Sequence, residues 1–440
     1  MSNLKKEIGL FGGISILAGI IIGSGIFALG SIVLKQVGFS IGLSLLAWAI
    51  GGIITLFSAL TYAELGTMFP ETGGHYVYLK KAYGKKVAFL SGLMGFVLSN
   101  SGSIAVLALI FSEVLSSLLP TANFIKPIAV ILILGLTIVQ FFGVKLGSTV
   151  QKIFMVAKIL PIIAIIFIGL FLSNEPLNFS FSTAEPVSFI TLLSMIGFGV
   201  IVTLWAYEGW TNLNVVAGEM KNVKKDLPKA LSLSTGLVMV VYLLFIVAIY
   251  RMIDSATLLS VADQEGYIPM VAMSIKYGTV GVQFVLIAVL ISIFGALNGS
   301  TMVFPRIYYA MAEDDNFFKS FKKVHPKYGT PYIAIIASGV MASILLVFDI
   351  RSLITFVAFG GLIFNTLIFI SVFLFRKREP ERERPYKVIF YPFVPIVAII
   401  GLVLLLIAAL IQSLIPSLIG FAVLVVGYFI YTPIVKRIKQ

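Results

Sequence analysis

Two short glycine-containing stretches hold the residues best suited to bind a small polar ligand. The first, residues 21–26, reads IIGSGI, and the second, residues 205–210, reads WAYEGW. Each lies inside a long apolar run, where we expect an interrupted helix. Such a helix leaves carbonyls without partners at the end of its first half and N–H groups without partners at the start of its second half. These groups attract a cation and an anion respectively.

Together, the two kinds of free backbone group suit a zwitterion. We expect a carboxylate on the amides of Ser24, Gly25 and Ile26, which begin the second half-helix, and an ammonium on the carbonyl of Ile21. The second stretch adds further carbonyls and aromatic rings that can cover the ligand. The predicted binding residues are Ile21, Gly23, Ser24, Gly25, Ile26, Trp205, Ala206, Tyr207 and Glu208. Ordinary packing is the alternative for the small and aromatic residues, but two matching stretches favour a site.

Two charged residues lie within the apolar runs, where a charge is costly. Lys158 lies in the run 151–173, about 10 Å deep at ~1.5 Å per residue. Its ammonium either reaches back to the membrane surface or faces the other helices and takes the place of a coupling cation. Glu208 has three possible roles, which are to cap the free amides of its own break, to carry a proton, or to bind a hydroxylated or cationic ligand. We rank capping first.

Two uncharged polar residues also need partners at depth, because a buried polar group without a hydrogen bond is costly. Tyr242 lies in the apolar run 231–251 and Asn298 in the run 279–305. Together with Lys158, they are the predicted coupling or gating residues.

Helices in a membrane must position these residues. Of the 440 residues, 59% are hydrophobic and only 12% are charged, about half the charged share of a soluble chain. A spanning helix needs about 20 apolar residues, and the runs lack the alternation of barrel strands. The first run is too long for a signal peptide and is interpreted as a first span. Twelve spans are predicted, at residues 8–34, 41–67, 87–119, 126–143, 151–173, 188–218, 231–251, 279–305, 331–348, 352–375, 391–413 and 417–435.

Lysine and arginine are distributed unevenly over the segments between these runs. With the N-terminus inside, 26 of them fall on the inner segments and five on the outer ones. This asymmetry is typical of membrane orientation, and it accounts for the net charge of +13 without a nucleic-acid partner. It predicts an even number of spans in a bacterial cytoplasmic membrane, with both termini in the cytoplasm.

The two interrupted runs begin two blocks of five spans, which start 180 residues apart. Because five is odd, the second block must be inverted relative to the first. Paired helix breaks in inverted halves indicate the binding site of a transporter near the middle of the membrane. The predicted organisation is an all-α membrane protein with a first repeat at 1–173, a second at 188–375, and two further helices with a cytoplasmic tail at 391–440.

The composition excludes several other chemistries. The chain has no cysteine, which rules out disulfides and thiolate sites. Its two histidines, His75 and His325, lie in basic loops, so we expect neither a metal site nor a cofactor. An enzyme is not expected, since no catalytic constellation lies at depth. A channel or membrane receptor is a further alternative, which saturable counterflow would distinguish from a transporter.

Several motifs resemble those of the amino acid–polyamine–organocation superfamily. The likeness is to its L-type amino-acid transporter branch, and most of all to the bacterial serine/threonine and alanine/serine/cysteine exchangers. It runs nearly end to end, and the order and spacing of the motifs make it specific. The motifs are IIGSGIF (21–27), YAELGTMFPETGG (62–74), the pair AK (157–158), AYEGW (206–210), GEMKN (218–222), SIFGALNG (292–299), VHP (324–326) and ERPYKV (383–388).

The resemblance implies a LeuT-type fold of 5+5 inverted helices, with the first and sixth unwound, that works by alternating access. It implies that residues 23–25 form the carboxylate-binding turn. It also implies that Lys158 stands in for a sodium ion near the first helix, and that Tyr242 acts in the same region. Trp205 falls where relatives commonly have a gating phenylalanine, so the gate here is expected to be bulkier.

Two departures from the family pattern limit the substrates and the partner proteins that we expect. Glu208 replaces the glycine of many animal members, which fits a smaller substrate pocket. The animal members also tether a single-pass glycoprotein through a cysteine after the third span. The corresponding loop here, residues 120–124, has no cysteine, which excludes a disulfide-linked subunit.

We therefore expect a sodium-independent exchanger of small neutral L-amino acids, of the alanine, serine and threonine class. The opposing gradient of another amino acid would supply the energy. The nearest alternative is proton-coupled symport through the same site, with Lys158 or Glu208 carrying the proton.

Overall fold

A computed structural model describes residues 4, 6–119, 121–173, 175–176, 179–183, 186–412 and 414–439. The predicted cysteine-free loop at 120–124 and the predicted tail each lie partly outside them. Within the described residues every regular element is a helix. The first half of the chain forms α1 (Leu10–Ile21), α2 (Gly25–Gln36), α3 (Ile41–Met68), α4 (His75–Tyr83), α5 (Lys85–Met94), the π-helix η1 (Gly95–Ser99), α6 (Asn100–Ser116), the 3-10 helix η2 (Ala122–Phe124), α7 (Ile125–Phe141) and α8 (Val144–Phe171).

The second half continues in the same way. It forms α9 (Phe189–Ala206), α10 (Asn212–Val215), the 3-10 helix η3 (Ala217–Glu219), α11 (Val223–Tyr250), α12 (Ser255–Asp263), α13 (Ile268–Val303), α14 (Pro305–Glu313), the 3-10 helix η4 (Lys319–Lys322), α15 (Tyr332–Leu345), α16 (Ile350–Arg378), α17 (Phe393–Gln412) and α18 (Leu414–Lys439).

Many of these helices are long and apolar enough to cross a membrane. Among the described residues nine pass on length and composition, and α1 with α2 makes a tenth if the pair, bent by 47°, counts as one broken span. The helix α15 and the segment Phe393–Ile407 of α17 are apolar but shorter. The chain is therefore an all-α, multi-pass membrane protein. Each of the twelve predicted runs contains a helix, but twelve crossings remain a prediction.

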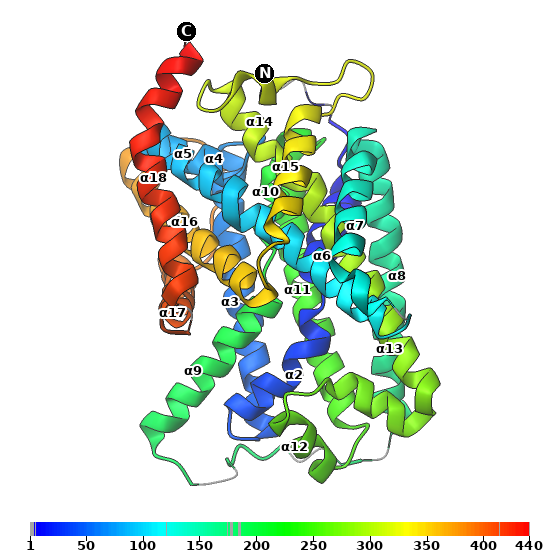
Figure 1. Cartoon of the computed structure of the whole chain (residues 1–440). Coiled ribbons are helices and arrows are strands. Elements are labelled where there is room, and N and C mark those ends of the chain that lie inside the picture. Colours follow the sequence, from blue (N-terminus) through cyan, green and yellow to red (C-terminus); the bar gives the residue numbers. More distant parts are fainter. Residues whose placement is uncertain are drawn as a thin grey trace.

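The broken first span occupies the centre of the helix bundle. α1 packs against α11, α8 and α13, while α2 packs against α9. Figure 1 shows α2 in the lower middle of the molecule, between α9 and α13, and both chain termini at the upper end. The three long helices around α1 therefore determine what its break can contact.

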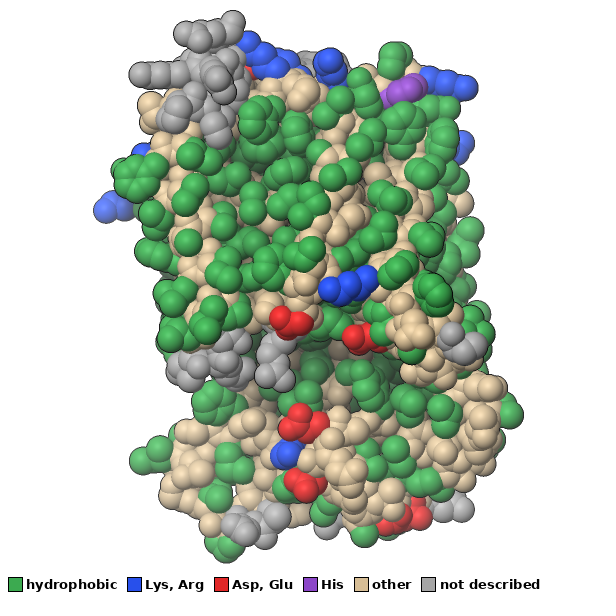
Figure 2. Space-filling view, viewed as in Figure 1, with side chains coloured by type: hydrophobic (Ala, Val, Ile, Leu, Met, Phe, Trp, Pro, Cys, Tyr) green, Lys and Arg blue, Asp and Glu red, His purple; other side chains and the backbone are tan. Residues whose placement is uncertain are grey.

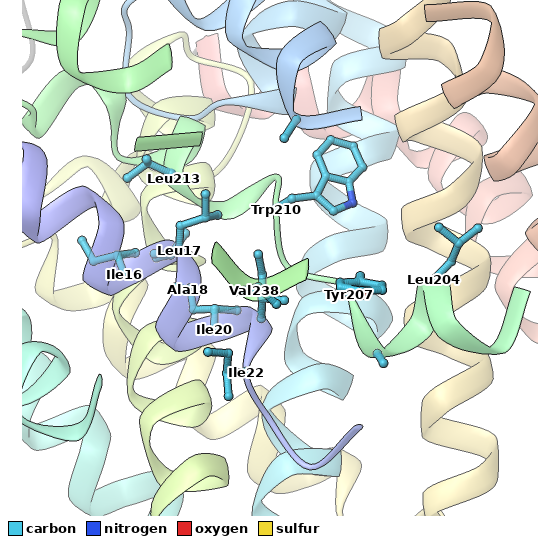
Figure 3. Packing of buried hydrophobic residues seen from close by; sticks show 14 of the residues in the cluster. Ile16, Leu17, Ala18, Ile20, Ile22, Leu204, Tyr207, Trp210, Leu213 and Val238 are labelled. Carbon is cyan, nitrogen blue, oxygen red and sulfur yellow. The ribbon is translucent and has the colours of Figure 1, made fainter. Parts of the chain in front are cut away.

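Apolar side chains pack α1 against α10, the short helix that follows α9. Figure 3 shows Leu17 of α1 near Leu213 of α10, while the ring of Trp210 points away from α1. That ring stacks on Phe369 of α16, with 5.5 Å between the ring centroids. Leu17, Leu213 and Trp210 are almost completely buried. The contact of α1 with α10 brings the two halves of the chain together beside the first break.

A cleft opens on the lower part of the molecule. Figure 2 shows it as a hollow between the main body and a lower part, which in Figure 1 holds α2 and α12. Most of the blue Lys and Arg side chains in this view lie toward the opposite, upper end.

Candidate functional site

The first helix break has the free backbone groups that an anion needs. α1 ends at Ile21, and a tight turn follows in which the amide of Gly23 donates to the carbonyl of Ile21 at 2.8 Å. α2 then starts at Gly25 without a side-chain cap. In the described part of the chain, the amides of Ser24, Gly25 and Ile26 have no backbone acceptor. They can therefore donate to a carboxylate.

The second break lies directly against the first. α9 ends at Ala206 and α10 begins at Asn212, and the turn between them includes Gly209 at φ 120°. A β-carbon on Gly25 would lie 3.0 Å from the Cα of Ala206, and one on Gly209 would lie 3.0 Å from Cγ2 of Ile20. Glycine at these two positions thus allows the breaks to touch, and at Gly209 it also adopts a backbone that other residues rarely adopt.

A cavity of about 180 Å³ lies where the breaks meet. Seven of the nine predicted binding residues line it, namely Ile21, Gly23, Ser24, Gly25, Trp205, Ala206 and Glu208. Ile26 was predicted to contribute only its amide, and its side chain is fully buried. Tyr207 is also buried, and its hydroxyl donates to the carbonyl of Trp48 at 3.2 Å. Its ring packs against Tyr242 rather than lining the cavity.

Glu208 contributes a carboxylate to this cavity. The backbone amide of Gly209, the next residue, interacts with this carboxylate. The side chain is accessible, because it faces the cavity. Among the described residues no cation forms an ion pair with it. Capping of its own break by Glu208 stays a prediction.

Lys158 of α8 faces the bundle rather than the membrane surface. Its side chain is fully buried. The ammonium donates to the carbonyls of Gly19 at 2.8 Å, Ile22 at 2.6 Å and Ser292 at 2.8 Å. All three N–H bonds of an ammonium are thereby used. The lysine joins the end of α1 to α13, directly behind the first break.

Tyr242 of α11 connects the two breaks. Its hydroxyl lies 3.1 Å from the carbonyl oxygen of Ile21 and 3.3 Å from that of Ala206. These carbonyls end the first halves of both broken spans, so they are the acceptors that were predicted to hold an ammonium. Tyr242 is fully buried and lies behind the cavity.

Asn298 lies apart from the cavity, in a buried amide network. It donates to Oε1 of Gln151 at 2.7 Å and to the carbonyl of Gly147 at 3.2 Å, and it accepts from Gln140 at 2.8 Å. Gln151 in turn donates to the carbonyl of Ser15 at 3.4 Å. The network joins α13 to α7, α8 and α1, so Asn298 can act only through the position of these helices.

Sequence reasoning missed several polar residues of the site. Ser292 donates to the carbonyl of Ile22 at 3.2 Å, beside the lysine. His75, Asn100 and Asn365 line the cavity, and Asn100 donates to the hydroxyl of Tyr308 at 3.2 Å. The signal for the two asparagines was present, since each is an amide within a predicted apolar run. His75 follows Gly73 and Gly74 in a segment interpreted as a basic loop, where no depth was expected; burial lowers the pKa of its imidazole to about 4.

The described residues contain no group of three or more histidine, cysteine or acidic side chains that could hold a metal ion. The charged groups at or beside the breaks are the Lys158 ammonium and the Glu208 carboxylate, together with the partial charges of the half-helix ends. These features define a membrane protein with a cavity between two helix breaks that is lined by both polar and apolar residues.

Comparison with known proteins identifies the group to which this architecture belongs. The chain is a member of the amino acid permease family, whose family model matches residues 8–435. It is 32% identical over 440 residues to the serine/threonine exchanger SteT of Bacillus subtilis (strain 168), which covers 99% of this chain and 98% of the relative. The expected membership of the amino acid–polyamine–organocation superfamily is thereby confirmed.

Animal relatives are similar over most of the chain as well. The b(0,+)-type amino acid transporter 1 of Mus musculus is 33% identical over 423 residues, which cover 94% of this chain and 84% of the relative. The large neutral amino acids transporter small subunit 2 of Homo sapiens is 31% identical over 445 residues, which cover 97% of this chain and 80% of the relative.

Proposed function

We propose that this protein exchanges small neutral L-amino acids across the cytoplasmic membrane without sodium. The observation that carries the proposal is the pair of helix breaks. Three amides at one half-helix start have no backbone acceptor among the described residues, and the carbonyls that end the two preceding half-helices lie close by. The substrate carboxylate binds the amides of residues 24–26. Its ammonium binds near the carbonyls of Ile21 and Ala206. The names of the relatives, which are amino acid transporters or exchangers, support amino-acid transport.

Lys158 supports the sodium-independent part of the proposal. Its ammonium already fills a site made of three backbone carbonyls from α1 and α13. Carbonyl oxygens in such a cluster are the ligands that a small hard cation prefers. A fixed positive charge there makes a bound sodium ion unnecessary and electrostatically unfavourable.

The substrate side chain then lies toward the wall formed by Trp205 and Glu208. Both line the cavity, Trp205 as a partly buried ring and Glu208 as a carboxylate. Bulky residues at both positions favour the alanine, serine and threonine class over large aromatic substrates. The carboxylate also offers an acceptor for a substrate hydroxyl.

Transport proceeds by alternating access around this cavity. The cleft of Figure 2 gives the outer route, and the end that carries both termini and most Lys and Arg side chains is the cytoplasmic end. Twelve crossings in two inverted blocks of five, followed by two further helices, fit this orientation. Substrate bound between the half-helices lowers the barrier to closure because it contacts both breaks.

Counterflow in liposomes tests the proposal. Purified protein is reconstituted with or without internal serine, in sodium-free potassium buffer, and uptake of labelled alanine is measured. Exchange requires internal serine and is unchanged when sodium replaces potassium. Uptake into empty liposomes that follows an imposed pH gradient would instead establish proton symport. That alternative is favoured by Glu208, which faces the cavity without a cationic partner among the described residues.

A further inference from the structure

A shallow apolar groove lies on the outside of the helix bundle, between α8 and α13. Figure 1 shows these two helices side by side at the right of the molecule. Ala288 lies at the floor of the groove and is 1% exposed, whereas Leu160 and Ile287 at its rims are 62% and 49% exposed. All the lining residues are apolar, namely Leu160, Pro161, Ala164, Phe284, Ile287, Ala288 and Ile291. The groove shares no lining residue with the cavity at the breaks.

The depth of the groove in the membrane decides what can fill it. α13 is interrupted at Gly278, which has φ 59°, and its second part begins at residue 279 on the outer side. Phe284 and Ile291 lie about 8 and 18 Å further along at ~1.5 Å per residue, within a hydrocarbon core about 30 Å thick. The groove therefore lies at the depth of the acyl chains of the outer leaflet, where no water is available to fill it.

Two aromatic rings close the groove toward the cytoplasm. Phe154 of α8 and Phe294 of α13 have ring centroids 4.2 Å apart. A β-carbon on Gly295 would lie 3.3 Å from Cβ of Phe154, so α8 and α13 touch there. Toward the outer side α8 packs tightly on α11 instead, since a β-carbon on Gly169 would overlap the carbonyl of Ala248. A chain can thus enter from the outer leaflet and end at the ring pair.

Two cations lie at the outer end of α8. Lys276 donates to the carbonyl of Leu172 and to Oγ of Ser173, the latter at 2.9 Å, which leaves one N–H of its ammonium. Arg251 donates to the carbonyls of Leu170 and Ser173, both at 3.3 Å. Neither cation forms an ion pair with a carboxylate of the described residues. Because a helix C-terminus carries only about half a negative charge, the two cations leave an excess of positive charge.

We propose that the groove and Lys276 together bind one anionic phospholipid of the outer leaflet, with an acyl chain in the groove and the phosphate on the ammonium. Basic residues beside membrane helices recognise lipid headgroups in this way. The chain then packs on the outside of the seam that Lys158 joins on the inside, because Ser292, whose carbonyl accepts from Lys158, directly follows Ile291. The proposal does not rest on the proposed function, since lipid binding is measured without transport.

Native mass spectrometry of the purified full chain tests the headgroup. The protein in detergent is titrated with phosphatidylglycerol and with phosphatidylcholine that carries the same acyl chains. One phosphatidylglycerol should bind about tenfold more tightly than phosphatidylcholine. Lys276→Gln should remove this difference, whereas Lys126→Gln, which alters another lysine of the outer side, should retain it. Equal binding of both lipids to the unmodified chain, or an unchanged difference in Lys276→Gln, overturns the proposal.

Filling the groove tests the acyl chain. Ala164→Phe places a ring in the groove and should weaken the binding of both lipids about tenfold. Val156→Phe is the matched control, because it adds the same ring at an exposed position of α8 outside the groove. Ala164→Leu should give an intermediate loss, which covers the case in which the phenylalanine variant does not fold. Unchanged binding in both Ala164 variants, or an equal loss in Val156→Phe, contradicts the site.

Glycerol phosphate, which has the phosphate but no acyl chain, separates a lipid site from a phosphate site. It should leave bound phosphatidylglycerol in place at equal concentration. Displacement at that concentration shows that the anion alone is recognised, and the lipid assignment then fails. A chain that binds phosphatidylglycerol as expected but shows no exchange contradicts the proposed function and leaves this site intact.

Discussion

Lys158 donates to three backbone carbonyls, those of Gly19 and Ile22 at the end of α1 and that of Ser292 in α13, and its removal takes away all three hydrogen bonds. We predict that Lys158→Ala lowers counterflow at least tenfold, because each hydrogen bond lost by a buried carbonyl costs ~1–3 kcal/mol and the break loses its geometry. Lys152→Ala, on the same helix, is the control and should have a small effect. Equal, mild losses in the two variants would show that the ammonium does not act at the break.

Glu208 should limit the size of the substrate side chain. Glu208→Gly removes the whole of a side chain that faces the cavity, so larger neutral amino acids should then compete for uptake of labelled alanine. Glu208→Gln keeps the volume and removes the charge, and it should retain the original size limit. A competition panel on the three proteins measures this, and an unchanged profile in Glu208→Gly rules out the size role.

The sequence indicated which residues lie near the helix breaks better than it indicated which partners those residues contact. The depth of Lys158 was clear, but depth does not say which helix face a residue occupies, and that face is set by packing of α8 on α1 and α13. Tyr207 is the opposite case. Its place in the second break predicted a cover for the ligand, but its ring packs against Trp48 and Tyr242 behind the cavity.

At the scale of elements, the close approach of the two breaks depends on glycine. We predict that Gly25→Ala reduces exchange strongly, since the added β-carbon would lie 3.0 Å from the Cα of Ala206 and force the half-helices apart. Gly197→Ala is the matched control in α9, where a β-carbon meets nothing within 4 Å. It should leave transport unchanged and stabilise the helix by up to about 1 kcal/mol. Similar transport losses in both variants would contradict the contact between breaks.

The broken spans were predictable because glycines interrupt otherwise continuous apolar runs. Other elements gave no such signal. α4, α12 and α14 have nine residues each and fell in segments interpreted as loops. Hydropathy finds helices that are apolar all round, and these short helices are not. The π-helix at Gly95–Ser99 was missed for another reason, because its sequence is as apolar as that of the flanking helix turns.

At the scale of the whole molecule, charge distribution predicts orientation, and a chain without cysteines makes the prediction easy to test. Gln264 follows α12 at the lower end of Figure 1, and Lys323 follows η4 near the termini; both are exposed. In intact cells, an impermeant maleimide should label Gln264→Cys and leave Lys323→Cys unlabelled until the cells are opened. Single-cysteine variants of this kind avoid any background thiol.

The orientation of the chain depends on many basic residues rather than on one contact. Basic side chains are retained on the cytoplasmic side during insertion, and 26 of them fall on one set of segments against five on the other. The asymmetry requires an even number of crossings between the termini, which lie at the same end. If Gln264→Cys and Lys323→Cys were labelled from the same side, an even number of crossings would separate the segments now assigned to opposite faces. The inverted relation between the two five-helix blocks would then fail, and with it the assignment of inner and outer half-helices at both breaks.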